Sequence, residues 1–416
     1  MDSQLAFSLG NDYIDDRKYK KYCQKRIADI LMHKLTEINI SMKIGILTHA
    51  LTTNYGGILQ NYALQQILKE KGYDPITIDY YYPTSIKVCI LSFASRILRR
   101  IKGESIPLRA WTTSKENEII AQNINRFITK YINRTRKCSI SEISTTTSYG
   151  FDALIVGSDQ VWRGGSRPVA KFFFSDFKYL DVPKVAYAAS FGTDIWKYNS
   201  KETKECKELV KDFSGISVRE GDAISLCEEY LNASAKLVLD PTLLISRSYY
   251  ENLVEDSNLQ PLKNNSMMVY ILDNSSTKDC IVNIISQKLD LSINNVRSEK
   301  YFSEVGTSKI DKCIFPSIEE WLRGFMEAKY VVTDSFHGTV FSIIFNKPFV
   351  SIVNKQRGAS RFYSLLNMFG LQDRLVYDIS KVDELIGKKI DFDAVNNILT
   401  EKRNESINFL IQSLNK

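Results

Sequence analysis

The chain has 416 residues, of which 44% are hydrophobic and 25% are charged, and its formal net charge is +7. This length exceeds what one hydrophobic core usually organises, so we expect two domains. No stretch approaches the roughly 18 apolar residues of a membrane span, no signal peptide is visible, and seven scattered cysteines without a C-x-x-C pair indicate a reducing cytoplasm rather than a zinc site.

The first predicted elements follow a strand, helix, strand order. Residues 1–41 carry charges of both signs without a clear strand, so we interpret them as an N-terminal extension. An apolar strand is predicted at 44–48, a helix of 3.6-residue period at 58–68 and a second strand at 75–80. This order is typical of a parallel, doubly wound α/β sheet, and we expect the first domain to span residues 42–250.

Most of the positive charge lies in residues 87–137, which hold twelve basic residues against three acidic ones, a net +9 that leaves −2 for the rest of the chain. Basic residues alternate there with aliphatic ones such as Ile90, Leu91 and Ile97. This pattern is typical of a helix on an anionic membrane surface, and a solvated basic face on an ordinary helix is the alternative. Nucleic acid is not an expected partner, because no nucleic-acid-binding motif accompanies the charge.

Further buried strands are predicted in both halves of the chain. In the first half they lie at residues 153–157, 184–188, 215–218 and 236–239. The polar stretch 246–266 marks the domain boundary, and the second domain is expected at residues 265–392. Its predicted strands lie at 267–272, 330–333 and 349–353, with helices after Ser276, over 339–345 and from Ser360. The amphipathic residues 393–416 are predicted to form a helix that packs back on the first domain.

His337 is the most distinctive candidate for chemistry, because the chain has only three histidines. It lies between the strand at 330–333 and the helix at 339–345. Ligands of open α/β sheets bind outside the carboxyl ends of the strands, and a helix N-terminus attracts anions and favours a neutral, proton-accepting histidine. A capped structural turn is the alternative, since turn chemistry alone explains Asp334, Ser335 and Gly338.

The start of the first predicted helix is a second candidate. Asn54 to Gly57 contains two adjacent glycines, which allow backbone amides to approach a ligand. The segment lacks both the G-x-G-x-x-G spacing of a dinucleotide site and the Gly-Lys-Ser/Thr ending of a P-loop. A plain turn therefore explains it equally well.

Polar side chains also follow other predicted strands. Ser158 to Trp162 places a carboxylate, an amide and an indole directly after a buried strand, which favours a ligand site. Arg219 emerges at the end of the strand at 215–218, where its guanidinium suits a carboxylate or phosphate and where Glu220 offers an ordinary salt bridge instead. Residues 355–361 add further cations. No histidine pair or histidine-plus-carboxylate set has metal-ligand spacing, so no metal is expected.

Several of these segments together resemble the polysaccharide pyruvyl transferase family, over residues 43 to about 374. The resemblance is carried by residues 43–48, 54–60, 151–162, 217–220, 240–242 and 334–338, in that order. It implies an α/β fold like that of the GT-B glycosyltransferases. In that fold, two Rossmann-like domains, each a parallel sheet with helices on both faces, face a cleft.

The resemblance also implies an activity. The pyruvyl group of phosphoenolpyruvate would be transferred as a ketal onto a sugar of a polysaccharide or lipid-linked oligosaccharide precursor, with release of phosphate and without a cofactor. Arg219 matches the donor-binding arginine of the family, and His337 matches its histidine near the reacting carbons. Ser335 stands where many members carry a second arginine, so Arg357 or Arg361 is expected to supply that cation.

These correspondences define three expected groups of site residues. His337 is expected to transfer a proton, and Asp159 to contact the acceptor hydroxyls. The donor-binding group consists of Arg219, Ser335, Gly338, Thr339, Arg357 and Arg361. The acceptor or cleft group, on the first domain, consists of Asn54, Tyr55, Gly56, Gly57, Gln60, Ser158, Gln160 and Trp162.

Two alternative functions use the same fold. A nucleotide-sugar glycosyltransferase is one, although the second domain shows no clear acidic or aromatic site for a nucleotide base. A non-catalytic carbohydrate-binding relative is the other, because the second arginine is missing. For the preferred function we expect a role in capsular polysaccharide or exopolysaccharide biosynthesis of a bacterium. The expected location is the cytoplasm, with peripheral contact at the anionic inner face of the cell membrane.

Overall fold

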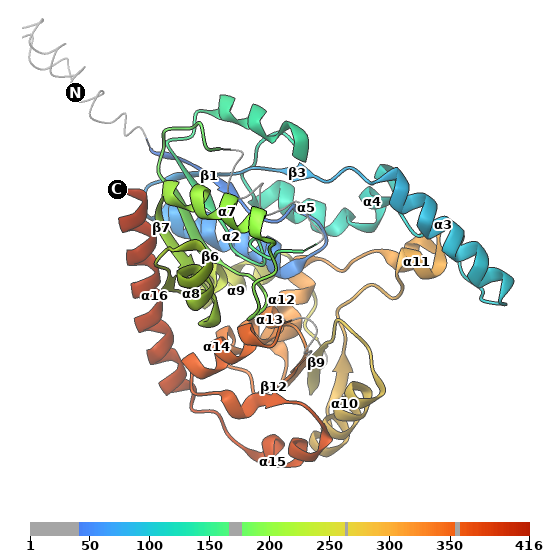
Figure 1. Ribbon diagram of the computed structural model, residues 1–416. Helices are drawn as coiled ribbons and strands as arrows, with labels where there is room; N and C mark the ends of the chain where they lie inside the picture. The colour runs from blue at the N-terminus through green and yellow to red at the C-terminus, as the bar shows by residue number, and fades with distance from the viewer. Residues whose placement is uncertain (1–40, 166–176, 263–264, 354–357) are drawn as a thin grey trace, which may run out of the picture. The chain divides into compact units, whose positions relative to one another are not determined.

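Two parallel β-sheets organise Lys43–Lys416, which form one unit of the chain (Figure 1). The computed structural model describes residues 41–165, 177–262, 265–353 and 358–416. The predicted extension 1–41 therefore lies almost wholly outside the described residues. None of the helices that the structure describes combines the length and the apolar character that a membrane crossing needs.

The first sheet has the strand order β2-β1-β5-β6-β7-β8, and all its pairs are parallel. Its strands are β1 (Lys43–Leu47), β2 (Asp74–Thr77), β5 (Ala153–Val156), β6 (Lys184–Ala189), β7 (Phe213–Val218) and β8 (Lys236–Leu237). Strands such as β5 are continuous apolar runs because both faces of a parallel sheet are covered. A separate pair joins β3 (Tyr80–Tyr81) to β4 (Cys138–Ser139).

Eight α-helices accompany the first sheet within the described part of the chain. One of them, α2, packs against β2 and begins at a side-chain cap, where Asn54 accepts a hydrogen bond from the Gly57 amide. The helices are α2 (Tyr55–Glu70), α3 (Ile86–Ile101), α4 (Ser114–Ile120), α5 (Gln122–Tyr131), α7 (Ser200–Leu209), α8 (Asp222–Leu226), α9 (Arg247–Glu255) and, from the end of the chain, α16 (Phe392–Leu414).

The second sheet has the order β10-β9-β11-β12-β13 and is also parallel throughout. Its strands are β9 (Ser266–Tyr270), β10 (Ser292–Asn294), β11 (Tyr330–Thr333), β12 (Phe349–Ile352) and β13 (Leu375–Val376). The helices in this half are α10 (Ser276–Leu289), α11 (Phe302–Val305), α12 (Ile318–Glu327), α13 (Phe336–Ile344), α14 (Ser360–Met368) and α15 (Val382–Gly387).

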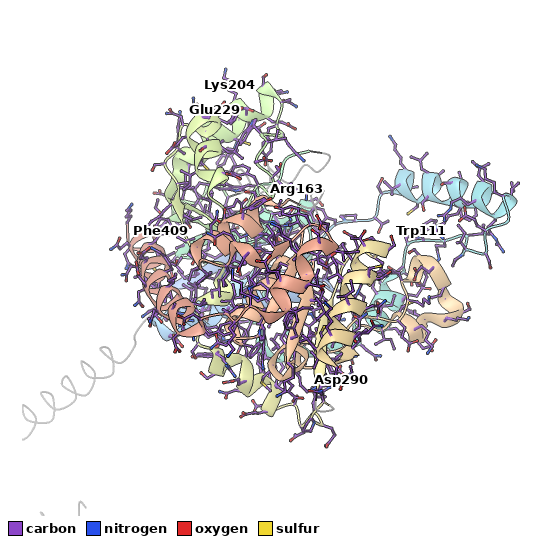
Figure 2. All side chains as sticks on the ribbon, turned by 90° about the horizontal axis from the view of Figure 1, so that it is seen from below. Trp111, Arg163, Lys204, Glu229, Asp290 and Phe409 are labelled. Atoms are coloured by element: carbon purple, nitrogen blue, oxygen red, sulfur yellow. The ribbon has the colours of Figure 1, made fainter. Side chains whose placement is uncertain are left out.

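The last helix, α16, contacts β6 and β7 of the first sheet. The Ser406 hydroxyl accepts a hydrogen bond from the Leu239 amide at 3.0 Å. Near the end of α16, a Cβ at Gly215 would lie 2.1 Å from the Ser413 Oγ, and Phe409, labelled in Figure 2, lies on the same helix. The absence of a side chain at Gly215 therefore allows α16 to lie directly on β7.

The predicted α/β class with parallel sheets is confirmed. Two predicted strands are shorter than expected, because β2 ends at Thr77 and β8 at Leu237, and two helices begin earlier than expected. Helix α2 begins at Tyr55 rather than at residue 58, and α13 begins at Phe336 rather than at residue 339. In both cases a polar side chain, Asn54 or Ser335, caps the helix. Each cap lies several residues before the first apolar residue of the helical pattern from which the start was predicted. His337 consequently lies inside the first turn of α13 and not in a loop before it.

Candidate active site

The carboxyl ends of the strands of both sheets surround one cavity of about 470 Å³. We call it the His337 cavity; it is lined by Tyr270 at the end of β9, by Asp159 after β5, and by Asp334 and His337 after β11. An adjacent cavity of about 640 Å³ shares Asp159 with it and is lined in addition by His49 and Tyr82. We call this second space the His49 cavity. Ligands of open α/β sheets bind at this edge of the sheet.

The imidazole of His337 is held in place by the start of α2. Ser335 caps α13 by accepting a hydrogen bond from the Gly338 amide at 3.4 Å, and this cap places His337 in the first helical turn. A Cβ at Gly56 would lie 2.0 Å from the Nδ1 of His337. Only a glycine at position 56 therefore allows the imidazole to lie against the backbone of α2.

The surroundings of His337 favour its neutral form. The side chain is buried, and its Nε2 has no hydrogen-bond partner among the described residues. Burial lowers the pKa of His337, and the nearby carboxylates of Asp240 and Asp159 oppose this shift only in part. The Oδ2 of Asp240 lies 3.8 Å from the Nε2, beyond hydrogen-bonding distance. A neutral imidazole with an unpartnered nitrogen can accept a proton.

Arg219 lies behind this cavity rather than at its surface. Its buried guanidinium donates hydrogen bonds to Asp159 at 2.7 Å and to Asp240 at 2.9 Å. It also lies over the ring of Phe336, 4.5 Å from the ring centroid. The expected direct contact of Arg219 with a donor does not fit this arrangement, because two carboxylates already engage its hydrogen-bond donors. Arg219 instead positions Asp159.

Asp159 and Asp240 stay ionised although both are buried. Burial would raise the pKa of Asp159, but Arg219 and the neighbouring cations hold it well below its ordinary value. Burial would raise the pKa of Asp240 as well, but His337, whenever it is protonated, together with the charge of Arg219 and the hydrogen bonds from Thr242, lowers it. Asp240 also accepts hydrogen bonds from Gln60 and from the amide and hydroxyl of Thr242. A connected ionic network therefore lies beneath the cavity.

Three guanidinium groups line the His337 cavity itself, those of Arg163, Arg297 and Arg361. Arg361 comes from α14 and lies 3.8 Å from Asp159, and burial and the proximity of Arg219 lower its pKa to about 10. Arg163 follows β5 and donates a hydrogen bond to Gln160 at 2.5 Å. Arg361, one of the two candidates for the missing cation, thus lines the same cavity as Ser335, whereas Arg357 lies outside the described residues.

Tyr55 joins the two halves of the site. Its ring stacks on Trp321 with a centroid distance of 5.6 Å and an angle of 15°. Its hydroxyl donates a hydrogen bond to the Pro316 carbonyl at 2.8 Å. Tyr55 therefore lines the cavity as part of the contact between α2 and the second half of the chain, and Asn54 lies beside it at the rim.

Several residues expected at the cavity lie below it instead. Trp162 is fully buried in the core of the first half, with its ring 5.6 Å from that of Phe191. The expected cleft position of Trp162 is therefore wrong, because its ring packs against Phe191 and Phe213 in this core. Gln60 and Ser158 are also buried and hydrogen-bond to each other at 3.0 Å. They support the ionic network and do not line the His337 cavity.

The backbone amides expected to bind an anion are also engaged. The Gly57 amide donates to Asn54, and the Gly338 amide donates to the Ser335 side chain. The Thr339 amide donates to the Ser335 carbonyl at 3.0 Å. These are ordinary hydrogen bonds at the start of a helix. The amides without intrahelical partners are therefore the ones that precede Gly57 in α2 and Gly338 in α13. Gln160, in contrast, lines both cavities as expected.

Sequence reasoning missed four cavity or network residues. Asp240 follows β8 and His49 follows β1, and neither residue was expected in the site. Asp240 belongs to residues 240–242, one of the segments that carry the family resemblance. The rule that ligands bind at strand ends points to both residues. Arg163 and Arg297 carry no comparable signal, because their positions depend on loops. In the described residues, no group of three or more histidine, cysteine or carboxylate side chains is arranged to hold a metal ion.

Comparison with known proteins identifies the family. The model of the family "Polysaccharide pyruvyl transferase" matches residues 54–356, which is most of the chain. The chain belongs to this family. The match includes α2 with its cap residue Asn54, the segment after β5, Arg219, Asp240 and the start of α13 with His337, whereas Arg361 in α14 lies beyond it. No curated protein sequence matches the chain.

The solved structures that resemble this polysaccharide pyruvyl transferase family member include GT-B-type glycosyltransferases and epimerases. UDP-GlcNAc 2-epimerase from Neisseria meningitidis, bound to UDP-GlcNAc, aligns over 90% of this chain and 99% of its own, with 8% identity and a TM-score of 0.50. Arabidopsis thaliana UGT89C1, complexed with UDP-L-rhamnose, covers 89% of this chain and 98% of its own, at 8% identity and a TM-score of 0.48. The two parallel sheets, together with the likeness to the Neisseria meningitidis epimerase, confirm the predicted fold of two Rossmann-like domains.

Proposed function

We propose that this protein transfers the pyruvyl group of phosphoenolpyruvate onto two hydroxyls of a sugar, which forms a cyclic ketal and releases phosphate. The observation that carries the proposal is the imidazole of His337, whose surroundings favour the neutral form and whose Nε2 has no hydrogen-bond partner among the described residues, in a cavity that three guanidinium groups line. Phosphoenolpyruvate carries a carboxylate and a phosphate, and guanidinium groups bind both through paired, charge-assisted hydrogen bonds.

The donor would bind in the His337 cavity. Arg163 would neutralise its charges from the side of the first sheet, and Arg297 and Arg361 from the side of the second. The first amides of α13, at Phe336 and His337, add hydrogen-bond donors without intrahelical partners at the positive end of a helix. In this arrangement Arg361 supplies the cation that the family pattern places at position 335.

The reaction would need proton movement at three places. The donor methylene gains a proton and becomes a methyl group, and C2 becomes electrophilic. One sugar hydroxyl attacks C2 and loses its proton; the C2–O bond to phosphate breaks; the second hydroxyl then attacks and loses its proton. One hydroxyl proton balances the one taken up by the methyl group, and the other leaves with the phosphate. The Nε2 of His337 is the group proposed to accept and deliver protons at C2 and C3.

The acceptor sugar would occupy the His49 cavity. Asp159 lies between the two cavities and can accept a hydrogen bond from a sugar hydroxyl. The exposed ring of Tyr82 provides an apolar face against which a sugar can lie. The acceptor class that we propose is a lipid-linked precursor of a capsular polysaccharide or exopolysaccharide, modified in the cytoplasm at the inner face of the membrane.

The test combines the donor with a panel of acceptors. The protein is incubated with phosphoenolpyruvate and galactose- or mannose-containing acceptors, and mass spectrometry follows the gain of one pyruvyl ketal with matching phosphate release. His337→Gln should lower turnover about 10²- to 10⁴-fold while donor binding persists. The control is Lys204→Gln, an exposed change on α7 (Figure 2).

Thermal shifts separate the alternatives. Stabilisation by phosphoenolpyruvate is expected, because a ligand that binds only the folded state raises the melting temperature. Stabilisation by nucleotide sugars alone would indicate a glycosyltransferase and would overturn the proposal. The absence of phosphate release with every acceptor of the panel would favour a non-catalytic carbohydrate-binding relative.

A further inference from the structure

Helix α3 exposes its apolar side chains to solvent. Ile86 and Ile101 are each 76% exposed and Leu91 is 70% exposed. The exposed large apolar residues of this helix are Ile86, Val88, Ile90, Leu91, Phe93, Ile97, Leu98 and Ile101. Isolated apolar residues are normal on a protein surface, whereas a contiguous set of this size marks an interaction site.

The apolar residues follow the period of the helix. Ile86, Ile90, Phe93, Ile97 and Ile101 are spaced by three and four residues and therefore form one stripe along α3. Leu91 and Leu98, seven residues apart, extend the same side. This side of α3 is continuous from the first to the last turn.

The opposite side of α3 faces the protein and is polar. Cys89 and Ser92 are half-buried, and Arg96 is the buried residue of the helix. The guanidinium of Arg96 donates hydrogen bonds to the Pro107 carbonyl at 2.7 Å and to the Ser303 carbonyl, in α11, at 2.9 Å. In Figure 1, α3 lies beside α11. A surface helix normally buries its apolar side and exposes its polar side, so α3 is oriented the opposite way.

The charge around this apolar side has one sign. The sequence of α3 contains no acidic residue, and its basic residues are Lys87, Arg96, Arg99 and Arg100, with Lys102 directly after it. Glu104 pairs with Arg99 at 2.5 Å, which leaves the excess positive. A cationic helix with a broad apolar side complements an anionic lipid surface, to which each nearby lysine or arginine adds attraction.

We propose that α3 docks on an anionic phospholipid membrane. Its apolar side would lie at the boundary between headgroups and acyl chains, with Lys87, Arg100 and Lys102 at the headgroups and Arg96 fixing the helix to α11. The helix has 16 residues and four basic side chains, which suits a position in the plane of the interface rather than across the bilayer.

This docking also has a place in the proposed function. Tyr82 lines the His49 cavity and precedes α3 by only a few residues. A membrane bound by α3 would therefore contact a segment that closely follows a lining residue of the His49 cavity, the cavity that we propose for the acceptor. This link to a lipid-linked acceptor rests on the proposed function, whereas the docking of α3 itself does not.

Vesicle flotation of the full chain tests the docking. The protein should float with vesicles of phosphatidylcholine and phosphatidylglycerol, but not with phosphatidylcholine alone, and about 1 M salt should weaken the binding. The double variant Ile90→Gln with Ile97→Gln should bind about tenfold or more weakly, because two aliphatic side chains no longer enter the lipid. The matched control is Ile195→Gln with Ile293→Gln, two exposed isoleucines outside α3.

Three results would overturn the proposal. These are a failure of the wild-type chain to float with anionic vesicles, equal binding by the Ile90 and Ile97 variant, and a concentration-dependent dimer that this variant abolishes without any vesicle binding. The last result would assign the apolar side to a second copy of the chain. Pyruvyl transfer to a water-soluble acceptor should persist in the Ile90 and Ile97 variant. If neither the wild-type protein nor the variant transferred the pyruvyl group, the proposed reaction would be refuted, but the proposal that α3 docks on a membrane would not.

Discussion

Position 56 is where a single methyl group should disable the proposed chemistry. A Cβ on Gly56 would lie 2.0 Å from Nδ1, 2.2 Å from Cγ and 2.6 Å from Cε1 of His337. Because non-bonded heavy atoms prefer about 3.5 Å, the imidazole would have to move by about 1.5 Å. A misplacement of about 1 Å can cost about 10²-fold in rate. We therefore expect Gly56→Ala to lower kcat about a hundredfold, or by about 2.7 kcal/mol of transition-state stabilisation.

Two measurements report on this change. The ketal-transfer assay gives kcat, and spectra of isotope-labelled histidine report on the ring without any substrate. The chain has only three histidines, so His337→Gln assigns the His337 signals by their loss. Burial lowers the pKa of His337 in the wild-type protein, so a displaced and better hydrated ring should titrate closer to its ordinary value.

A glycine with open surroundings provides the control. Gly387 ends α15, and a Cβ there would meet no atom within 4 Å. Gly387→Ala should leave kcat and all histidine signals unchanged. If Gly56→Ala kept the wild-type kcat and an unshifted His337 spectrum, the contact between α2 and the imidazole would not position this group, and the argument built on it would fail.

Three further predictions concern stability. Because the pKa of His337 is lowered in the folded state, its contribution to stability is present above about pH 6.5 and is lost as the pH falls through the lowered value. On acidification, the urea midpoint of His337→Gln should therefore fall less than that of the wild-type protein. An equal fall in both proteins would contradict the lowered pKa. Asp240→Asn removes one partner from the buried Arg219 and should cost about 3 kcal/mol in urea unfolding, against less than about 1 kcal/mol if the pair were not ionic. Tyr55→Phe removes the hydrogen bond to Pro316 and should cost about 1 kcal/mol, whereas an unchanged midpoint would mean that water replaces it.

The strands could be predicted from the sequence because their burial dictates composition. Both β5 and β11 are covered on two faces, so each is an uninterrupted apolar or β-branched run. Helix starts were harder to predict. Helix α13 begins with Phe336, His337 and Gly338, which form no apolar period, and its start is set by the hydrogen bonds of the Ser335 cap.

The position of the candidate site could be predicted from the sequence, but the contacts between its side chains could not. The strand-end rule places His337, Asp159 and Arg219 at neighbouring edges, and the structure places them there. Arg219 donates hydrogen bonds to two carboxylates, and one of them, Asp240, lies after a different strand. The sequence does not reveal that these two residues meet. The inward position of Trp162 depends on aromatic partners from other segments. Such pairings are tertiary, and no local pattern encodes them.

The buried residues Asp159, Arg219 and Asp240 form one ionic unit, so a change of one of them alone is costly. Removing one of them leaves an uncompensated buried charge that costs about 3–5 kcal/mol, a large part of the 5–15 kcal/mol that typically separates a folded from an unfolded protein. The outer cations, such as Arg163 and Arg297, carry no such linkage. Divergence within this lineage should therefore exchange outer cations one at a time, and so retune which anion is accepted, while the inner network is inherited intact.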